Sequence, residues 1–181
     1  MCPALAERSS DIVLPAIGTP FEGGILAAAT AMFDGRTRVI ITADKSAGGE
    51  LGCFAWATDY RSVPGAKSFT DSMANTAALD GEQFPAAQAC RAYRAGGFDN
   101  WCLPSLVDQE AVRLNLCPIW TEIPAFKTGG EQAYEDACYW TSTQSQFGQN
   151  YAWRQDFGSG GSDHWGKDND YRVRPVRILF I

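Results

Sequence analysis

The sequence predicts an α+β domain with its helices in the middle of the chain and strands on either side. Hairpin-like apolar runs lie between residues 24 and 44, two capped helical segments lie between 85 and 116, and only short β-type segments follow residue 119. A chain of 181 residues usually buries roughly 70% of its unfolded surface, so one core is expected. We therefore predict one domain over residues 21–181, preceded by an extended arm over residues 1–20.

The arm is predicted because prolines at positions 3, 15 and 20 occur without any apolar period. Charged and polar residues from Glu7 to Asp11 interrupt the apolar stretch that a signal peptide needs. No window of the sequence approaches 18 consecutive apolar residues. We therefore expect synthesis in a cytoplasm without a signal peptide, no membrane span, and an arm that docks onto a neighbouring subunit.

Residues 25–42 predict a β-hairpin. Two apolar runs, Ile25–Phe33 and Arg36–Thr42, flank the dipeptide Asp34-Gly35, which favours the positive φ angles of a two-residue turn. In the loop-rich segment that follows, the aromatic stretch Gly52–Thr58 predicts one short strand.

Two helices are predicted from their end signals. Pro85 suits a first helical turn and Gly96-Gly97 suits a stop, which together predict a helix over Ala86–Ala95. The second helix is expected over Ser105–Leu116, with a serine cap at its start and a proline just beyond its end.

Short strands are predicted near residues 138–143, 151–157 and 171–181, separated by clusters of Gly, Asn and Asp. In the last of these segments the apolar residues change parity around Pro175. Because proline cannot donate to a strand ladder, the change predicts a bulge or an edge position there.

Charge and cysteine usage exclude several classes of function. The net charge is −6 and no run of Lys or Arg occurs, so nucleic acid is not an expected partner. The six cysteines show no C-x-x-C spacing. Without an export signal we expect free thiols rather than disulfides or a zinc site.

Three motifs in order carry a family resemblance. They are Trp101-Cys102-Leu103-Pro104-Ser105, Tyr139-Trp140-Thr141-Ser142-Thr143 and Val173-Arg174-Pro175-Val176-Arg177. The series resembles the C-type-lectin-like domains of the Lcl adhesin C-terminal type, which occur in bacteriophage tail proteins and bacterial adhesins. The resemblance spans Gly24 to Phe180 and implies a C-type lectin-like fold. In that fold two helices flank short antiparallel sheets, and the N- and C-terminal strands pair.

The resemblance also implies that most motif residues are structural, with Trp101, Trp140 and Trp153 as core rings. Lectins of this fold hold calcium through Glu-Pro-Asn or Gln-Pro-Asp and Trp-Asn-Asp tripeptides, and none of these occurs here. The acidic cluster could offer oxygen ligands to a hard cation such as calcium, but it lacks the spacing of a calcium loop. We therefore expect a solvated turn with no cofactor, and calcium binding is the alternative. That cluster comprises Asp163, Asp168, Asn169 and Asp170.

The sequence offers little catalytic chemistry, and we expect no enzyme. A sister group of the fold, the formylglycine-generating oxidases, uses a pair of cysteines, whereas Cys102, Cys117 and Cys138 are scattered here. The sequence contains no G-x-S-x-G motif, so His164, the single histidine, has no such nucleophilic serine for which it could act as the base. An oxidase of that type remains only a third alternative.

Two polar loops between the motifs, Gln144–Asn150 and Gly158–Asp170, have the composition of a paratope. Alternation along 151–157 places Trp153 and Phe157 inward, and Arg154 and Asp156 outward. The candidate ligand- or partner-binding residues are Gln144, Gln146, Gln149, Asn150, Tyr151, Arg154, Asp156, His164, Trp165, Asp168, Asn169 and Tyr171.

These features predict a non-enzymatic virion protein of a bacteriophage tail fibre or baseplate. Its lectin-like domain would bind a host-surface glycan or protein, or a tail partner. Other tail subunits would contact residues 1–20 in an oligomeric assembly. The family also resembles the variable proteins of diversity-generating retroelements. The alternative from another class is a bacterial adhesin or carbohydrate-binding domain.

Overall fold

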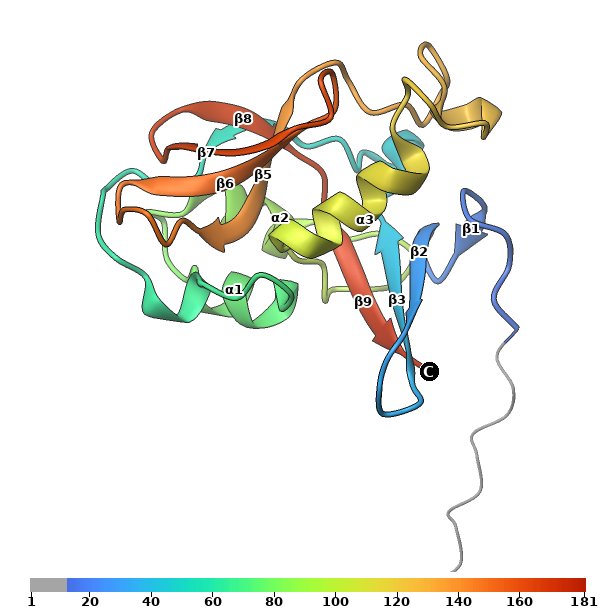
Figure 1. Ribbon diagram of the computed structural model, residues 1–181, viewed down its shortest axis with the longest axis horizontal. Helices are drawn as coiled ribbons and strands as arrows, with labels where there is room; N and C mark the ends of the chain where they lie inside the picture. Colours follow the sequence, from blue (N-terminus) through green and yellow to red (C-terminus); the bar gives the residue numbers. More distant parts are fainter. Residues whose placement is uncertain (1–12) are drawn as a thin grey trace, which may run out of the picture.

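The computed structural model describes residues 13–181 and contains two β-sheets and three α-helices in that range (Figure 1). This composition confirms the α+β prediction. Of the predicted arm, residues 1–12 lie outside the described part. Residues 14–19 belong with the domain, since Leu14 and Ile17 pack against core residues and Gly18 N donates to Leu26 O at 2.8 Å.

The four-stranded sheet has the order β1-β2-β3-β9. Its strands are β1 (Pro20–Phe21), β2 (Gly24–Ala31), β3 (Thr37–Thr42) and β9 (Val176–Phe180). The antiparallel β3–β9 register runs from Arg38 opposite Phe180 to Thr42 opposite Val176. The C-terminal strand therefore pairs with the N-terminal hairpin, as the resemblance implied.

The β2–β3 hairpin is confirmed, but its turn is longer than predicted. Met32 N donates to Arg36 O at 2.8 Å, which leaves Phe33, Asp34 and Gly35 as the loop. Gly35 alone has a positive φ, of 85°. This is the geometry of a three-residue loop closed by a left-handed glycine, and the two-residue turn was wrong.

The five-stranded sheet has the order β4-β8-β5-β6-β7. Its strands are β4 (Gly52–Ala55), β5 (Cys138–Gln144), β6 (Tyr151–Asp156), β7 (Ser162–Gly166) and β8 (Asp170–Val173). All neighbours are antiparallel except β5 and β8, which pair in parallel at Tyr139 and Arg172. A register shift interrupts the β5–β6 pairing between Trp140 and Gln144.

The helices are α1 (Ser72–Ala78), α2 (Pro85–Ala92) and α3 (Leu106–Leu116), and three single 3₁₀ turns are η1 (Lys45–Ala47), η2 (Pro64–Ala66) and η3 (Pro124–Phe126). The predicted serine cap of α3 is confirmed, because Ser105 Oγ accepts from Asp108 N. Helix α2 ends earlier than predicted, since Tyr93 already has an extended ψ of 138°. Helix α1 was not predicted, so the expected number of two helices was wrong.

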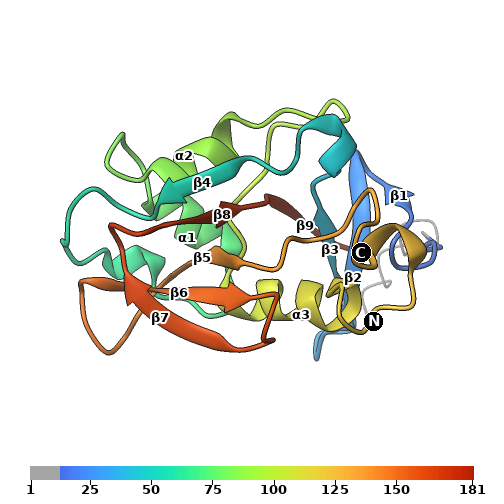
Figure 2. The same ribbon diagram turned by 90° about the horizontal axis from the view of Figure 1, so that it is seen from above.

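All three helices lie on the same side of the five-stranded sheet (Figures 1 and 2). Helix α1 contacts β5, α2 contacts β4 and β8, and α3 contacts β5 and β6. Helix α3 also contacts β2 and β3. It therefore lies between the two sheets and joins them into one body.

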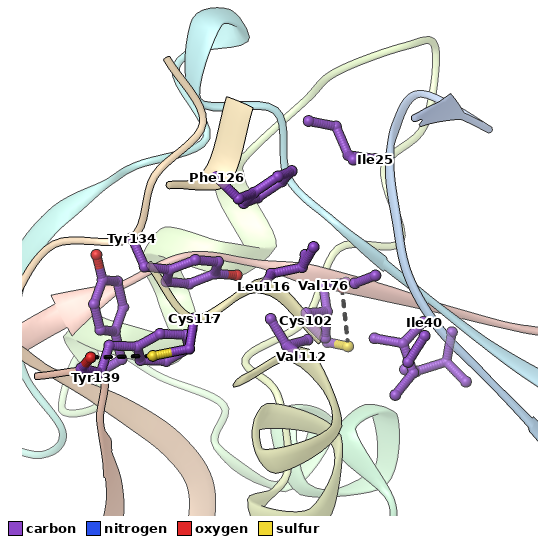
Figure 3. Packing of buried hydrophobic residues seen from close by; sticks show 14 residues of the cluster. Ile25, Ile40, Cys102, Val112, Leu116, Cys117, Phe126, Tyr134, Tyr139 and Val176 are labelled. Carbon is purple, nitrogen blue, oxygen red and sulfur yellow. Dashed lines mark hydrogen bonds between the residues drawn. The ribbon is translucent and has the colours of Figure 1, made fainter. Parts of the chain in front are cut away.

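Large rings fill the core. Trp101 and Trp140 are 2% and 1% exposed, as the resemblance implied, and Trp56 is completely buried as well. Figure 3 shows a second region of the core, where Tyr134 and Tyr139 pack beside Leu116 and Cys117 of the α3 end. Trp153 is only half-buried, so its prediction as a core ring was wrong.

The parity change at Pro175 marks a crossing between sheets. Val173 ends β8 in the five-stranded sheet, and Val176 begins β9 at the edge of the four-stranded sheet. Arg174 between them is 1% exposed and donates to Ala43 O and to the side-chain and backbone oxygens of Gln132. The pattern predicted a bulge or an edge position within one strand, whereas the structure has two strands that face two cores.

Candidate functional site

The β6–β7 hairpin presents different side chains on its two faces. In the antiparallel register Trp153 is opposite His164, whereas Arg154 is opposite Asp163. Directly opposed residues share a face and successive residues alternate, so the two pairs lie on opposite faces. Strand β7 is the last strand of its sheet, and this hairpin therefore forms the edge of the molecule's larger sheet.

One face carries a group of rings that we call the aromatic face, formed by Phe69, Phe147, Tyr151, Trp153 and His164. The imidazole centroid of His164 lies 5.4 Å from the rings of Phe147 and Tyr151 and 5.5 Å from Trp153. Phe69 extends the group, with its centroid 6.1 Å from that of Trp153. Phe147 is 68% exposed and Tyr151 is 42% exposed, so much of this ring surface faces solvent.

The other face carries the arginine sandwich, formed by Arg154, Trp165 and Tyr171. The guanidinium carbon of Arg154 lies 4.8 Å from the ring centroids of both Trp165 and Tyr171. Its Nη1 donates to Cys138 Sγ at 2.7 Å, which fixes the side chain further. Trp165 is 45% exposed above this support, so its indole is held in place while one surface remains open.

Polar candidates border the aromatic face. Gln146 is exposed and accepts from Trp153 Nε1 at 3.1 Å, and Gln149 and Asn150 are exposed in the loop beside it. Asp168 is exposed near Tyr60, and its hydrogen bond with the Tyr60 hydroxyl raises the pKa of that tyrosine. The structure thus brings together most of the predicted residues around one hairpin.

Two predicted site residues belong to the framework instead. Gln144 is 1% exposed, and its Oε1 accepts from Val63 N at 2.7 Å and from Lys167 Nζ at 3.0 Å. Asp156 turns its carboxylate into the β6–β7 turn, where it accepts from Gly158 N at 2.8 Å and Ser159 Oγ at 2.6 Å. Gln144 is therefore not available to a ligand, and Asp156 does not point outward as predicted.

Asn169 also has a structural role. Its backbone N and its Nδ2 both donate to Gly166 O, at 3.1 Å and 3.0 Å. Lys167 N donates to Asn150 O, and Asp156 N donates to Gly161 O. These two hydrogen bonds show that the peptide groups of the odd-numbered residues in β7 point toward β6. The peptide groups of the even-numbered residues, Gly166 among them, therefore point to the free edge, and Asn169 covers one of them.

Asp163 covers a second position on the same edge. Its Oδ1 accepts from His164 N at 2.7 Å, so the N–H of His164 is already occupied. Such capping discourages the addition of a foreign strand to a sheet edge. Recognition at this hairpin would therefore use side chains rather than strand pairing.

Lys167 is a site-supporting residue that the sequence did not reveal. It is completely buried, its ammonium lies 4.5 Å from the Trp56 ring centroid, and Nζ donates to Arg61 O at 2.9 Å. Burial lowers the pKa of Lys167 to about 8. Together with Gln144 it ties the segment around residue 61 to the end of β5 and to the β7–β8 turn. No pattern around a lone lysine in a polar turn predicts such burial.

The thiols that the structure describes are unpaired. Cys102 Sγ donates to Val176 O at 3.3 Å (Figure 3). Cys117 Sγ donates to Phe157 O, also at 3.3 Å. Burial raises the pKa of both thiols. These two sulfurs are therefore neutral packing groups in the core.

Within residues 13–181, no three side chains of His, Cys, Asp or Glu come together as metal ligands. In the same range no helix is long and apolar enough to cross a membrane.

No match was found among curated proteins. Residues 46–177 match the Lcl C-terminal domain family, which points to an adhesin-like or lectin-like role. This match covers most of the chain, and the protein belongs to the Lcl C-terminal domain family.

Proposed function

We propose that this protein is a non-enzymatic recognition domain of a bacteriophage tail, and that it binds a host-surface glycan or protein through the β6–β7 hairpin. The observation that carries the proposal is the concentration of exposed rings there, with Phe147, Tyr151 and Trp165 each more than two-fifths exposed. A cluster of exposed rings is typical of a binding surface, because a partner that covers the rings removes their apolar surface from water.

The composition of the surface supports recognition of a partially polar partner. Rigid rings give contact area at a small entropy cost, and Gln146, Gln149 and Asn150 beside them supply amide donors and acceptors. The arginine sandwich holds Trp165 in one orientation before binding, which reduces the ordering cost on association.

A bacterial adhesin or carbohydrate-binding domain is the second candidate, and the same amide-bordered rings favour it. Glycan-array binding measured with and without calcium separates the candidates. Signal that disappears with a chelator favours a calcium-dependent lectin, whereas binding only to intact host cells or tail particles favours the phage protein. A formylglycine-generating-type oxidase has less support, since Cys102 and Cys117 are buried and bonded to the backbone.

The direct test is adsorption of the purified protein to host cells. Tyr151→Ala combined with Trp165→Ala should reduce adsorption by about tenfold or more, because a few central aromatic residues usually dominate binding energy. Phe33→Ala is the matched control: Phe33 is fully exposed, but it lies in the β2–β3 turn of the other sheet. Wild-type protein that adsorbs to no host cell and joins no tail particle would sink the proposal.

Assembly into an oligomeric tail structure through the N-terminal arm is part of the proposal. The deletion that tests it removes residues 1–12 only, because Leu14 and Ile17 pack against the domain and their loss would confuse attachment with folding. Unchanged incorporation into tail particles after this deletion would dispose of the attachment role.

A further inference from the structure

A cleft of about 410 Å³ lies where the chain leaves α3 and returns toward β5, and Phe157 and Gly158 of the β6–β7 turn line part of it. Its apolar lining comes from Pro118, Ile119, Tyr134 and Phe157. The last two rings stack with their centroids 4.1 Å apart and are almost completely buried, so this part of the cleft is rigid. The volume is within the range of small-molecule sites.

One wall of the cleft is a glycine-containing turn with available peptide groups. Gly129 has a φ of 81°, a conformation that favours glycine, and it lines the cleft together with Gly130. Within residues 13–181, neither the N–H nor the C=O of Gly129 makes a hydrogen bond with the protein. The turn therefore offers a backbone acceptor and a backbone donor to a ligand.

The charges at the cleft favour a cation. Lys45 lines it, but its ammonium is already held by Glu135 Oε1 at 2.7 Å and Ala133 O at 3.0 Å. Asp136 also lines the cleft, and in the described chain its carboxylate has no ion-pair or hydrogen-bond partner. It lies directly over the α-carbon of Gly158, where any side chain would overlap it. One uncompensated negative charge therefore stands beside an apolar lining.

We propose that this cleft binds a small organic cation, an alkylammonium or alkylguanidinium group on a short apolar stem. The stem would lie against Pro118 and Ile119, and the cation would pair with Asp136 and a carbonyl of the Gly129 turn. The same chemistry is available from a free amine or from a Lys or Arg side chain of a partner protein.

The test is NMR titration of the whole protein with n-butylammonium and n-butylguanidinium. Both should shift the amide signals of Gly129, Gly130 and Gly158 with saturation in the millimolar range, whereas n-butyrate, of similar size and opposite charge, should not. Asp136→Asn should weaken binding by about five- to tenfold, the usual effect of losing a charge-assisted hydrogen bond. Glu82→Gln, which removes an exposed carboxylate beside α2, should leave the affinity unchanged.

Equal shifts with butyrate, or an unchanged affinity in Asp136→Asn, would overturn the proposal. A tripeptide Gly-Lys-Gly with blocked ends distinguishes the two sources. Tighter binding than n-butylammonium indicates a protein side chain, and weaker binding indicates a free amine. Since Asp136 is exposed, an unchanged melting temperature is expected and confirms that the substitution leaves the fold intact.

Discussion

Replacing Lys167 with methionine should remove a pH dependence of stability that the buried ammonium creates. Lys167 has no solvent exposure. Two oxygens and the Trp56 ring contact its ammonium, and the carboxylate of Asp59 offsets part of the effect of burial. Burial lowers its pKa from the ordinary 10.5 to about 8 in the folded protein. Methionine has similar length without the charge, so the substitution isolates the ammonium.

The sign follows from proton binding. At pH 7 both states carry the proton, so the folded state bears the full penalty of a buried cation, about 3 kcal/mol. Between pH 8 and 10.5 the unfolded chain keeps the proton that the folded protein has lost, and the free energy of unfolding rises with pH. Of that penalty, about 2 kcal/mol should be relieved between about pH 7 and about pH 9.5.

The quantity to measure is the difference in free energy of unfolding between wild type and Lys167→Met, from urea titrations at a series of pH values. A difference is needed because buried thiols act in the opposite direction. The pKa of Cys90 and that of Cys102 are raised by burial, so these thiols make the folded state less favourable at alkaline pH. They are present in both proteins and cancel.

The difference should change by about 2 kcal/mol in favour of wild type as the pH rises over that window. Lys127→Met is the control, since Lys127 is half-exposed and pairs with the exposed Glu122. A difference that stays constant to within about 0.5 kcal/mol would refute the reasoning, because a lysine free to reach water has no such dependence.

Three further predictions concern stability. Asp108→Asn should lower the free energy of unfolding by about 3 kcal/mol in urea titrations, because it removes the buried carboxylate of the 2.6 Å ion pair with the partly buried Arg38; a loss under about 1 kcal/mol would contradict this. Gly96→Ala should lower the free energy of unfolding by about 2 kcal/mol, since the added methyl group would overlap the Gly23 backbone and Gly96 has a φ of 59°. An unchanged melting temperature would argue against that close approach. Phe33→Ala should change stability by less than about 0.5 kcal/mol, as its ring is fully exposed, and a larger loss would mean that the ring is packed.

Elements with strong local signals were predictable from the sequence. Helix α3 begins where Ser105 can cap it, and the β2–β3 hairpin surrounds the glycine that its turn requires. Helix α1 has only seven residues, and its stability comes from contacts with β5 and η2 rather than from its own sequence. A short helix of this kind gives little periodicity to detect.

The candidate site was predictable in region but not in detail. The ring and amide composition of the loops indicated the β6–β7 hairpin, and Trp165 and Tyr151 are exposed there. Gln144 was misassigned because its burial depends on the β5 register shift, which alternation along one strand cannot show. Lys167 was missed because long-range packing against Trp56 decides its burial.

The register shift in β5 gives a physical reason for the Tyr-Trp-Thr-Ser-Thr motif. The shift removes part of the β5–β6 ladder, and the motif replaces the lost pairing with hydroxyl and backbone bonds. Thr141 Oγ1 donates to Trp153 O at 2.8 Å, and Thr143 Oγ1 accepts from Leu106 N at 3.1 Å. Ser142 N donates to Pro104 O at 2.7 Å.

These bonds connect β5 to the start of α3 on one side and to β6 on the other. The carbonyl that Thr141 holds is that of Trp153, whose ring belongs to the aromatic face. Every residue from Tyr139 to Thr143 is buried, so none of them can contact a ligand directly. The motif therefore supports the hairpin from the core side, while the side chains of Phe147, Tyr151 and Trp165 make none of the hydrogen bonds that hold β5 in place.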